Sequence, residues 1–263
     1  MTDSTTKSKS RLKKLLTAAA TAVFWLLVWQ LAALVIDQGI VLSPPLEVFR
    51  TLVSLAGTGT FWLTIAATAL RIFAGFAAGV ICGVLLALAA HESSIVRTLL
   101  SPFMSVVRAT PVASFIIMLL FFSENKYIPT VISFLMVLPA IWANVLKGIE
   151  ETDRGLLEMA RVFELSRSDV LRDIYIPSVK PYFVPAALTS LGFAWKAGVA
   201  AEVLAAPSLS VGGMLYRAKI YLETPEMLAW TLCVIIISML LEKLLAALLR
   251  RGGAERRGKN VKA

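Results

Sequence analysis

The sequence has few of the residues that most enzyme and metal sites need. It holds two cysteines, Cys82 and Cys233, each inside an apolar run, and a single histidine, His91. This pattern excludes a disulfide framework and a Cys/His metal cluster. The motifs GxxxxGK[ST], HExxH and GxSxG are also absent, so the chain has no recognisable phosphate-binding loop, zinc-protease helix or nucleophile elbow. We expect no metal, cofactor or catalytic residue in this chain.

Charge is also scarce. Charged residues make up 16% of the chain and hydrophobic residues 58%, whereas soluble proteins have about 25% and about 45–50%. The chain therefore has too little polar surface to coat a soluble domain, and the bilayer is its natural solvent. The net charge of +9 does not indicate nucleic acid as a partner, because the basic residues gather at the two ends and flank apolar runs.

Six segments are long and apolar enough to cross about 30 Å of hydrocarbon. They predict an all-α polytopic membrane protein, and the first is expected to be a retained span because no signal-peptide cleavage pattern follows it. Between the first two spans, residues 43–56 predict a short amphipathic helix on the outer face. The predicted spans lie near residues 16–36, 63–90, 98–122, 128–147, 181–205 and 227–249.

The basic residues predict the orientation of the spans. If the N-terminus is cytoplasmic, most Lys and Arg fall in the two tails and in the long loop before the fifth span. The positive-inside rule then places both chain ends in the cytoplasm. The predicted organisation is a basic tail at 1–15, a membrane domain at 16–249 that includes a cytoplasmic loop at 148–180, and a second basic tail at 250–263.

The loop at 148–180 has a helical pattern of its own. Apolar residues share one face between Asp153 and Phe163. A second short helix is expected to begin at Ser166, with Asp169 completing a capping box, and to end at Pro177. Apolar side chains on such short helices need a partner surface. The loop is therefore predicted to bind another protein.

The same loop resembles the EAA motif of ABC importer permeases, which reads Glu-Ala-Ala, three residues, Gly, nine residues, Ile-x-Leu-Pro. Here the pattern reads EMA from Glu158, three residues, Glu164, nine residues and IYIP up to Pro177. Glu164 replaces the Gly, and because Glu should avoid positive φ we expect an adjusted turn. The segments LSPPLEVFRTL, LRIFAGFAAGVICGVLLAL and LGFAWKAGVAAEVLA resemble the permeases for sulfonates, taurine and nitrate.

This resemblance implies a type I ABC importer permease in the bacterial cytoplasmic membrane. The family implies a homodimer, two ATPase subunits that bind ATP and Mg²⁺, and an external substrate-binding protein. The helix from Asp153 to Phe163 would be the coupling helix, seated in a cleft of the ATPase. Glu158 would meet a basic residue there, and Leu156, Ala160 and Phe163 would fill the cleft. The coupling residues implied by the resemblance are Asp153, Leu156, Leu157, Glu158, Ala160, Arg161, Phe163, Glu164, Ile174 and Pro177.

Charged residues within the spans are candidates for the substrate path, because they are costly in lipid. Arg108 and Lys196 lie deep, and Trp195 and Glu202 are close to Lys196 in the sequence. Lys196 is expected to face an anionic substrate, to pair with an acidic group or to snorkel. Arg71, about a third of the way along the second predicted span, is close enough to its end to snorkel outward and is expected to be structural.

Glycines suggest where helices approach closely. Gly75, Gly79 and Gly83 recur every four residues, a spacing that predicts either a moving or dimer interface or tight packing within one subunit. Gly212 and Gly213 predict a flexible turn in an external segment, followed by a short helix.

The expected function is a permease for a small organic anion, such as an aliphatic sulfonate, taurine or a nitrate-like solute. A thiamine precursor or a riboflavin-like solute is the alternative within the superfamily. A polytopic membrane enzyme is less favoured because no Asp, His and Glu cluster within the spans. A secondary carrier is less favoured because no inverted repeat is evident.

Overall fold

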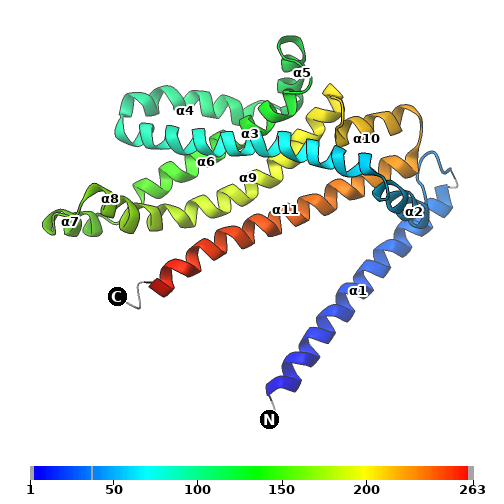
Figure 1. Cartoon of the computed structure of the whole chain (residues 1–263), viewed down its shortest axis with the longest axis horizontal. Helices are drawn as coiled ribbons and strands as arrows, with labels where there is room; N and C mark the ends of the chain where they lie inside the picture. Colours follow the sequence, from blue (N-terminus) through cyan, green and yellow to red (C-terminus); the bar gives the residue numbers. More distant parts are fainter. Residues whose placement is uncertain (1–2, 37, 260–263) are drawn as a thin grey trace.

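The computed structural model describes the backbone of residues 3–36 and 38–259 and the side chains of residues 16–17, 19–36 and 38–248. The side chains of both predicted basic tails, 1–15 and 250–263, lie outside this set. All elements of the described chain are helices (Figure 1). They are α1 (Asp3–Ile36), α2 (Pro45–Ala56), α3 (Gly59–Glu92), α4 (Ser94–Ala109), α5 (Val112–Phe122), α6 (Ile128–Glu150), α7 (Arg154–Val162), α8 (Arg167–Asp169), the π-helical segment η1 (Val170–Tyr175), α9 (Ile176–Ala205), α10 (Val211–Ile220) and α11 (Thr224–Lys259).

The spans confirm the predicted all-α polytopic class, with one correction. Within the described residues, five helices are long and apolar enough to cross a membrane, and α4 with α5 makes a sixth if the pair is one broken span. The predicted third span, 98–122, is wrong as a single helix, because α4 and α5 are bent by 102°. Pro111 lacks a backbone N–H and restricts the residue before it. Thr110 accordingly ends α4 in an extended conformation, with φ −76° and ψ 129°.

The centre of the bundle is formed by α6, which packs along both α3 and α9. The three glycines of α3 face α6. A Cβ added at Gly79 would lie 2.7 Å from Cβ of Val137, and one added at Gly83 would lie 2.9 Å from Cβ of Ile141. The glycines, Gly75 included, therefore let the α3 and α6 backbones approach closely. This contact favours the second alternative, tight packing within one subunit.

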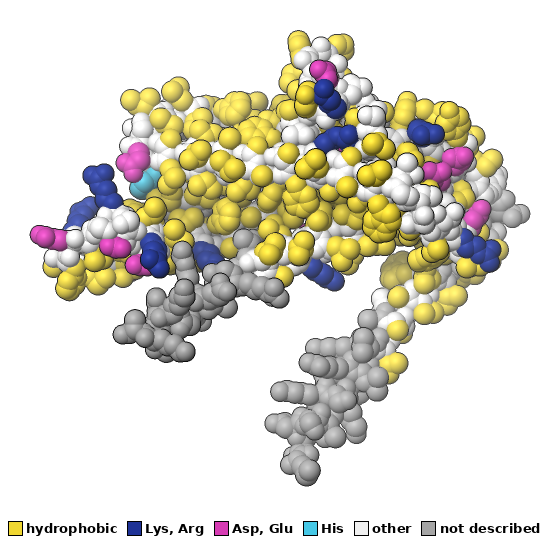
Figure 2. All heavy atoms as spheres, viewed as in Figure 1, with side chains coloured by type: hydrophobic (Ala, Val, Ile, Leu, Met, Phe, Trp, Pro, Cys, Tyr) yellow, Lys and Arg dark blue, Asp and Glu magenta, His cyan; other side chains and the backbone are white. Residues whose placement is uncertain are grey.

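Charged groups lie mainly at the two ends of the bundle. Figure 1 shows α7 and α8 at one end and α2 and α10 at the other. Figure 2 shows hydrophobic side chains over the length of the bundle. Most charged groups lie over the two ends, and a few lie near α5 and on the lower edge. A long apolar body with polar ends fits a bilayer. The chain is an integral membrane protein.

One span, α1, is barely packed by its own chain. It extends away from the bundle (Figure 1), and only 6% of its apolar stretch, Ala19–Ile36, is buried. Its main contact is with α2. The apolar surface of α1 must therefore be covered by lipid or by another subunit.

Candidate functional site

The predicted coupling helix is present as α7. Asp153 begins it, since Oδ1 of Asp153 accepts a hydrogen bond of 2.8 Å from the backbone N–H of Gly155. This N-cap satisfies a backbone donor that the helix itself cannot pair. The first of the two short helices therefore forms where the pattern predicts it.

The residues predicted to couple to an ATPase divide into an outer and an inner group. Leu156 and Phe163 are 42% and 70% exposed, and Glu158 and Arg161 are also exposed. Ala160 is only 3% exposed, so its predicted place in a partner's cleft is wrong. A helix nine residues long can present one face to a partner only if the opposite face packs on its own chain.

The inner group holds the hairpin, which consists of α7, α8 and η1, to the rest of the chain. Besides Ala160 it includes Ile174, which is buried, and Leu157, which is half-buried. These side chains come from α7 and η1, which contact each other. Their role is to set the orientation of α7, because buried apolar contacts fix the angle between packed elements.

Two exposed apolar residues were missed by the sequence reasoning. Val162 is 79% exposed and Met159 is also exposed. Leu156, Met159 and Phe163 recur at intervals of three and four, which is the spacing of one helix face. That spacing was the available signal, but the motif placed Met159 at an Ala position. Together with Val162 these residues form the outer face, defined as Leu156, Met159, Val162 and Phe163.

The turn after α7 has the left-handed backbone conformation that favours glycine, although the residue there is Glu164. Glu164 has φ +50°, so the expectation of an adjusted turn is wrong. The N–H of Leu165 donates to the carbonyl of Ala160 at 2.9 Å, and that of Glu164 donates to Arg161 at 3.1 Å. These two bonds make a Schellman motif, which places its C′ residue in the left-handed region. The hydrogen bonds and the buried Ala160 outweigh the strain on Glu164.

We expect Glu164→Gly to stabilise the hairpin by about 1 kcal/mol, because a non-glycine residue in the left-handed region is strained. Hydrogen exchange at the Leu165 amide should slow about fivefold, since this amide closes the turn. As a matched control, Glu158→Gly within α7 should speed exchange, because glycine costs about 1 kcal/mol in a helix interior. Faster exchange in Glu164→Gly would contradict the strain argument.

The second short helix begins as predicted but does not end at Pro177. The Oγ of Ser166 accepts from the N–H of Asp169 at 3.2 Å, which is the expected cap. The chain then continues through η1 into α9, and the N–H of Ile176 donates to Leu171, five residues back. Proline is tolerated in the first turn of a helix. In the π-helical segment before Pro177, hydrogen bonds reach five residues back instead of four. The hairpin is therefore continuous with a membrane span.

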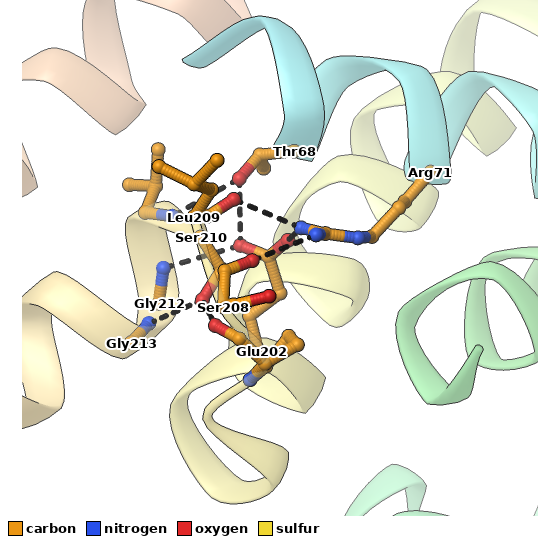
Figure 3. A network of polar contacts seen from close by, with 10 residues as sticks. Thr68, Arg71, Glu202, Ser208, Leu209, Ser210, Gly212 and Gly213 are labelled. Carbon is orange, nitrogen blue, oxygen red and sulfur yellow. Dashed lines mark hydrogen bonds and ion pairs between the residues drawn. The ribbon is translucent and has the colours of Figure 1, made fainter. Parts of the chain in front are cut away.

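A buried polar network lies toward the α10 end of the bundle (Figure 3). Glu202 of α9 is fully buried. Its carboxylate accepts from the hydroxyl of Thr68 at 2.9 Å, from Nη1 of Arg71 at 3.1 Å and from the N–H of Gly212 at 3.2 Å. The predicted path residue Glu202 thus lies inside the protein, where it joins α3, α9 and α10.

Arg71 completes this network. Besides Glu202, its guanidinium donates to the carbonyls of Ser208 at 2.8 Å and Leu209 at 3.1 Å. Arg71 therefore has the structural role expected for it, but it pairs with Glu202 instead of snorkelling outward. A buried carboxylate needs a cation and further hydrogen bonds to offset its desolvation. Arg71 supplies the cation and fixes the loop between α9 and α10 at the same time.

Close backbone approach explains the glycine pair in this segment. Gly212 and Gly213 lie in the first turn of α10, so their predicted role as a flexible turn is wrong. A Cβ at Gly212 would lie 2.6 Å from the carbonyl oxygen of Val199 and 2.5 Å from the amide nitrogen of Val203. The absent side chain lets the start of α10 reach the Glu202 carboxylate.

The remaining candidate path residues lie in different places. Trp195 is buried, and its Nε1–H donates to the carbonyl of Val234 on α11 at 3.1 Å. Lys196 is exposed on α9 beside α11. Arg108 is exposed at the end of α4, which packs on α3 and α6. The chain therefore does not bring Arg108 and Lys196 to one site, and their roles in a path stay predictions.

Comparisons with known proteins agree with this architecture. The chain is 28% identical over 241 residues to the taurine transport system permease protein TauC of Escherichia coli, which covers 89% of this chain and 86% of that protein. It is 28% identical over 244 residues to the nitrate import permease protein NrtB of a Synechocystis strain, covering 88% of this chain and 86% of that protein. The bicarbonate transport system permease protein CmpB of Synechococcus elongatus is 25% identical over 196 residues, covering 73% and 69%.

A solved structure supports the fold. A bacterial ABC transporter involved in the import of the acidic polysaccharide alginate has a chain that superposes with a TM-score of 0.62 at 15% identity, covering 95% of this chain and 99% of that one. The family described as binding-protein-dependent transport system inner membrane component matches residues 79–251. The match includes the hairpin, α9 and Glu202, whereas Thr68 and Arg71 lie before it. The chain therefore belongs to this family, and it is a permease subunit of an ABC importer.

Proposed function

We propose that two copies of this chain form the translocation path of an importer for a small organic anion, such as an aliphatic sulfonate, taurine or a nitrate-like solute. Two ATPase subunits bind at the two hairpins and hold ATP and Mg²⁺, and an external binding protein delivers the solute. Both chain ends lie in the cytoplasm of a bacterial cell, and the span region lies in its cytoplasmic membrane. The names of the relatives, which specify taurine, nitrate and bicarbonate, support this solute class.

The observation that carries this proposal is the outer face of α7. Leu156, Met159, Val162 and Phe163 present exposed apolar side chains at the end of the bundle. Apolar residues on a short polar helix outside the spans need a protein partner. Because the hairpin runs without a break into α9, a partner that moves α7 moves a span as well. Closure of the ATPase subunits can then shift the conformational equilibrium of the spans through this contact.

The exposed α1 supports the homodimer. Its apolar stretch is buried to only 6% by its own chain, and a symmetric partner would cover it reciprocally. At the α10 end, Tyr216, Arg217 and Lys219 are exposed. This aromatic and basic surface suits contact with an external binding protein, since aromatic and Arg side chains are enriched in interfaces.

Topology labelling and co-purification test the proposal together. We expect Phe163→Cys, in a background with Cys82→Ser and Cys233→Ser, to react with a membrane-impermeant maleimide only after the cytoplasmic side is opened. We also expect an ATPase subunit expressed with the permease to co-purify with it in detergent at equal stoichiometry. Labelling of Cys at position 163 in intact cells would contradict the orientation, and loss of the ATPase from the wild-type permease would contradict the coupling role.

A further inference from the structure

A pocket of about 760 Å³ lies where the hairpin joins the spans, at the end of the bundle where Figure 1 shows α7 and α8. Its walls come from the last turns of α3 and α6, from η1 and from the first turns of α9, and Leu248 of α11 lines it as well. Ligand sites commonly have volumes of about 300–1,000 Å³. The pocket is therefore large enough for a ligand, and an occupant would contact a span and the hairpin together.

The lining of this pocket changes from apolar to polar along the bundle axis. On α3, Val84 and Leu88 come first and His91 follows near the helix end. On α9, Phe183 lies deeper in the span than Lys180. The seven residues from Val84 to His91 span about 10 Å at 1.5 Å per residue. An apolar wall of this depth below a polar rim matches a molecule that has a hydrocarbon chain and a polar head.

The rim carries a cation that has no partner within its own chain. Lys180 is half-buried, whereas Glu92 on the opposite side of the rim is exposed. Among the residues whose side chains are described, no carboxylate lies within 4 Å of the Lys180 ammonium group. A half-buried ammonium group favours an anion beside it, because pairing offsets its desolvation. Basic pockets between spans bind lipid headgroups in this way.

The same rim belongs to the hairpin. Tyr175 of η1 lines the pocket, and its ring contacts that of His91 edge-on, with the centroids 6.4 Å apart. π-helical segments such as η1 are frequent at functional sites, because their hydrogen bonding departs from that of the α-helix on either side. A ligand that contacts both α3 and η1 therefore favours one orientation of the hairpin over others.

We propose that a phospholipid of the leaflet on the hairpin side binds in this pocket and holds the hairpin in its orientation. One acyl chain fills the apolar part between α3 and α9, and the phosphate lies beside Lys180. The bilayer supplies this ligand directly, since the pocket-lining Leu88 is 43% exposed on the surface of a span. The inference rests on the proposed function only in naming this leaflet as the cytoplasmic one.

Photo-crosslinking tests whether the acyl chain occupies the pocket. The probe is a phosphatidylglycerol with a diazirine in one acyl chain, added to the full-length permease with its ATPase subunits in detergent. We expect adducts on the pocket walls of α3 and α9, located by peptide mass spectrometry. Leu88→Trp fills the pocket and should reduce labelling at least fivefold. Leu85→Trp, on the same helix but outside the pocket and 59% exposed in the wild type, should leave it unchanged.

Competition tests the headgroup. Unlabelled phosphatidylglycerol should displace the probe from the wild type about tenfold better than a diacylglycerol with the same chains and no phosphate, the scale of one charged hydrogen-bonding contact. Lys180→Gln should abolish this difference. Lys147→Gln, at an exposed lysine of α6 outside the pocket, should keep it. Hydrogen exchange of the η1 amides should slow about fivefold with phosphatidylglycerol in the wild type and remain unchanged in Leu88→Trp.

The inference is overturned if Leu88→Trp and Leu85→Trp label alike while both elute as the wild type does in size-exclusion chromatography. It is also overturned if the two competitors act equally on the wild type, or if η1 exchange does not respond to phosphatidylglycerol. Cross-links between two copies in place of lipid adducts would assign the pocket to subunit contact. ATPase retention is scored in the same preparation. Retention without pocket labelling contradicts only this inference, and labelling without retention contradicts only the proposed function.

Discussion

Replacing Leu156 and Phe163 together by Asp is expected to release the ATPase subunits from the permease. Both side chains are exposed on the outer face of α7, so the change removes contact surface without disturbing the buried Ala160. Burial of one large apolar side chain contributes about 1.5–3 kcal/mol. Loss of two such contacts should weaken ATPase binding about 100-fold or more. Retention on a tagged permease in detergent, at known ATPase concentrations, measures the effect.

A matched control lies at the opposite end of the bundle. Leu222 is also an exposed apolar residue, and Leu222→Asp should leave ATPase retention within about twofold of the wild type. Both variants should elute as the wild-type permease does in size-exclusion chromatography, since neither changes a buried residue. Equal retention by the α7 double variant and the Leu222 variant would show that the outer face is not the ATPase contact.

Glu202→Leu should destabilise the permease by about 3–5 kcal/mol, the usual cost of removing one partner from a buried ion pair. The change leaves the N–H of Gly212 and the hydroxyl of Thr68 without their buried acceptor. It also leaves Arg71 with backbone carbonyls alone. The midpoint of thermal unfolding in detergent should fall, and protease cleavage between α9 and α10 should become faster.

An exposed ion pair provides the comparison. Arg97 and Glu150 also form a salt bridge, but both side chains are substantially exposed, and such pairs contribute about 0–1 kcal/mol. Glu150→Leu should therefore shift the unfolding midpoint far less than Glu202→Leu. Adding Arg71→Met to Glu202→Leu should recover part of the stability, because it removes the unpaired cation. Similar shifts for Glu150→Leu and Glu202→Leu would mean that the buried network stabilises little.

The spans were predictable because their signal is local. A run of about 20 apolar residues is sufficient to identify a membrane helix, and α3, α6, α9 and α11 lie close to the predicted ranges. The break between α4 and α5 was missed because the range 98–122 is apolar enough as a whole to pass for one span. Hydropathy measures solvent preference, whereas the bend depends on a missing N–H and a restricted φ.

The site was predictable only in part, for the same reason. The spacing from Glu158 to Pro177 located the hairpin, but the division between Ala160 inside and Phe163 outside depends on packing against η1. The pairing of Arg71 with Glu202 joins residues 131 positions apart, and neither local sequence indicates the other. Glu164 shows the limit of residue preferences, since the surrounding hydrogen bonds hold it in a conformation that favours glycine.

The unbroken helical rod from Arg167 to Ala205 has a mechanical consequence. Ile174 anchors its hairpin end and Glu202 anchors α10 near its other end, about 40 Å away at 1.5 Å per residue. A helix of this kind resists shortening, so it moves as a rigid body along its axis or by tilting. A displacement of the hairpin must therefore also displace the Arg71–Glu202 ion pair. A spectroscopic reporter placed on α10 should respond to nucleotide bound at the far side of the membrane.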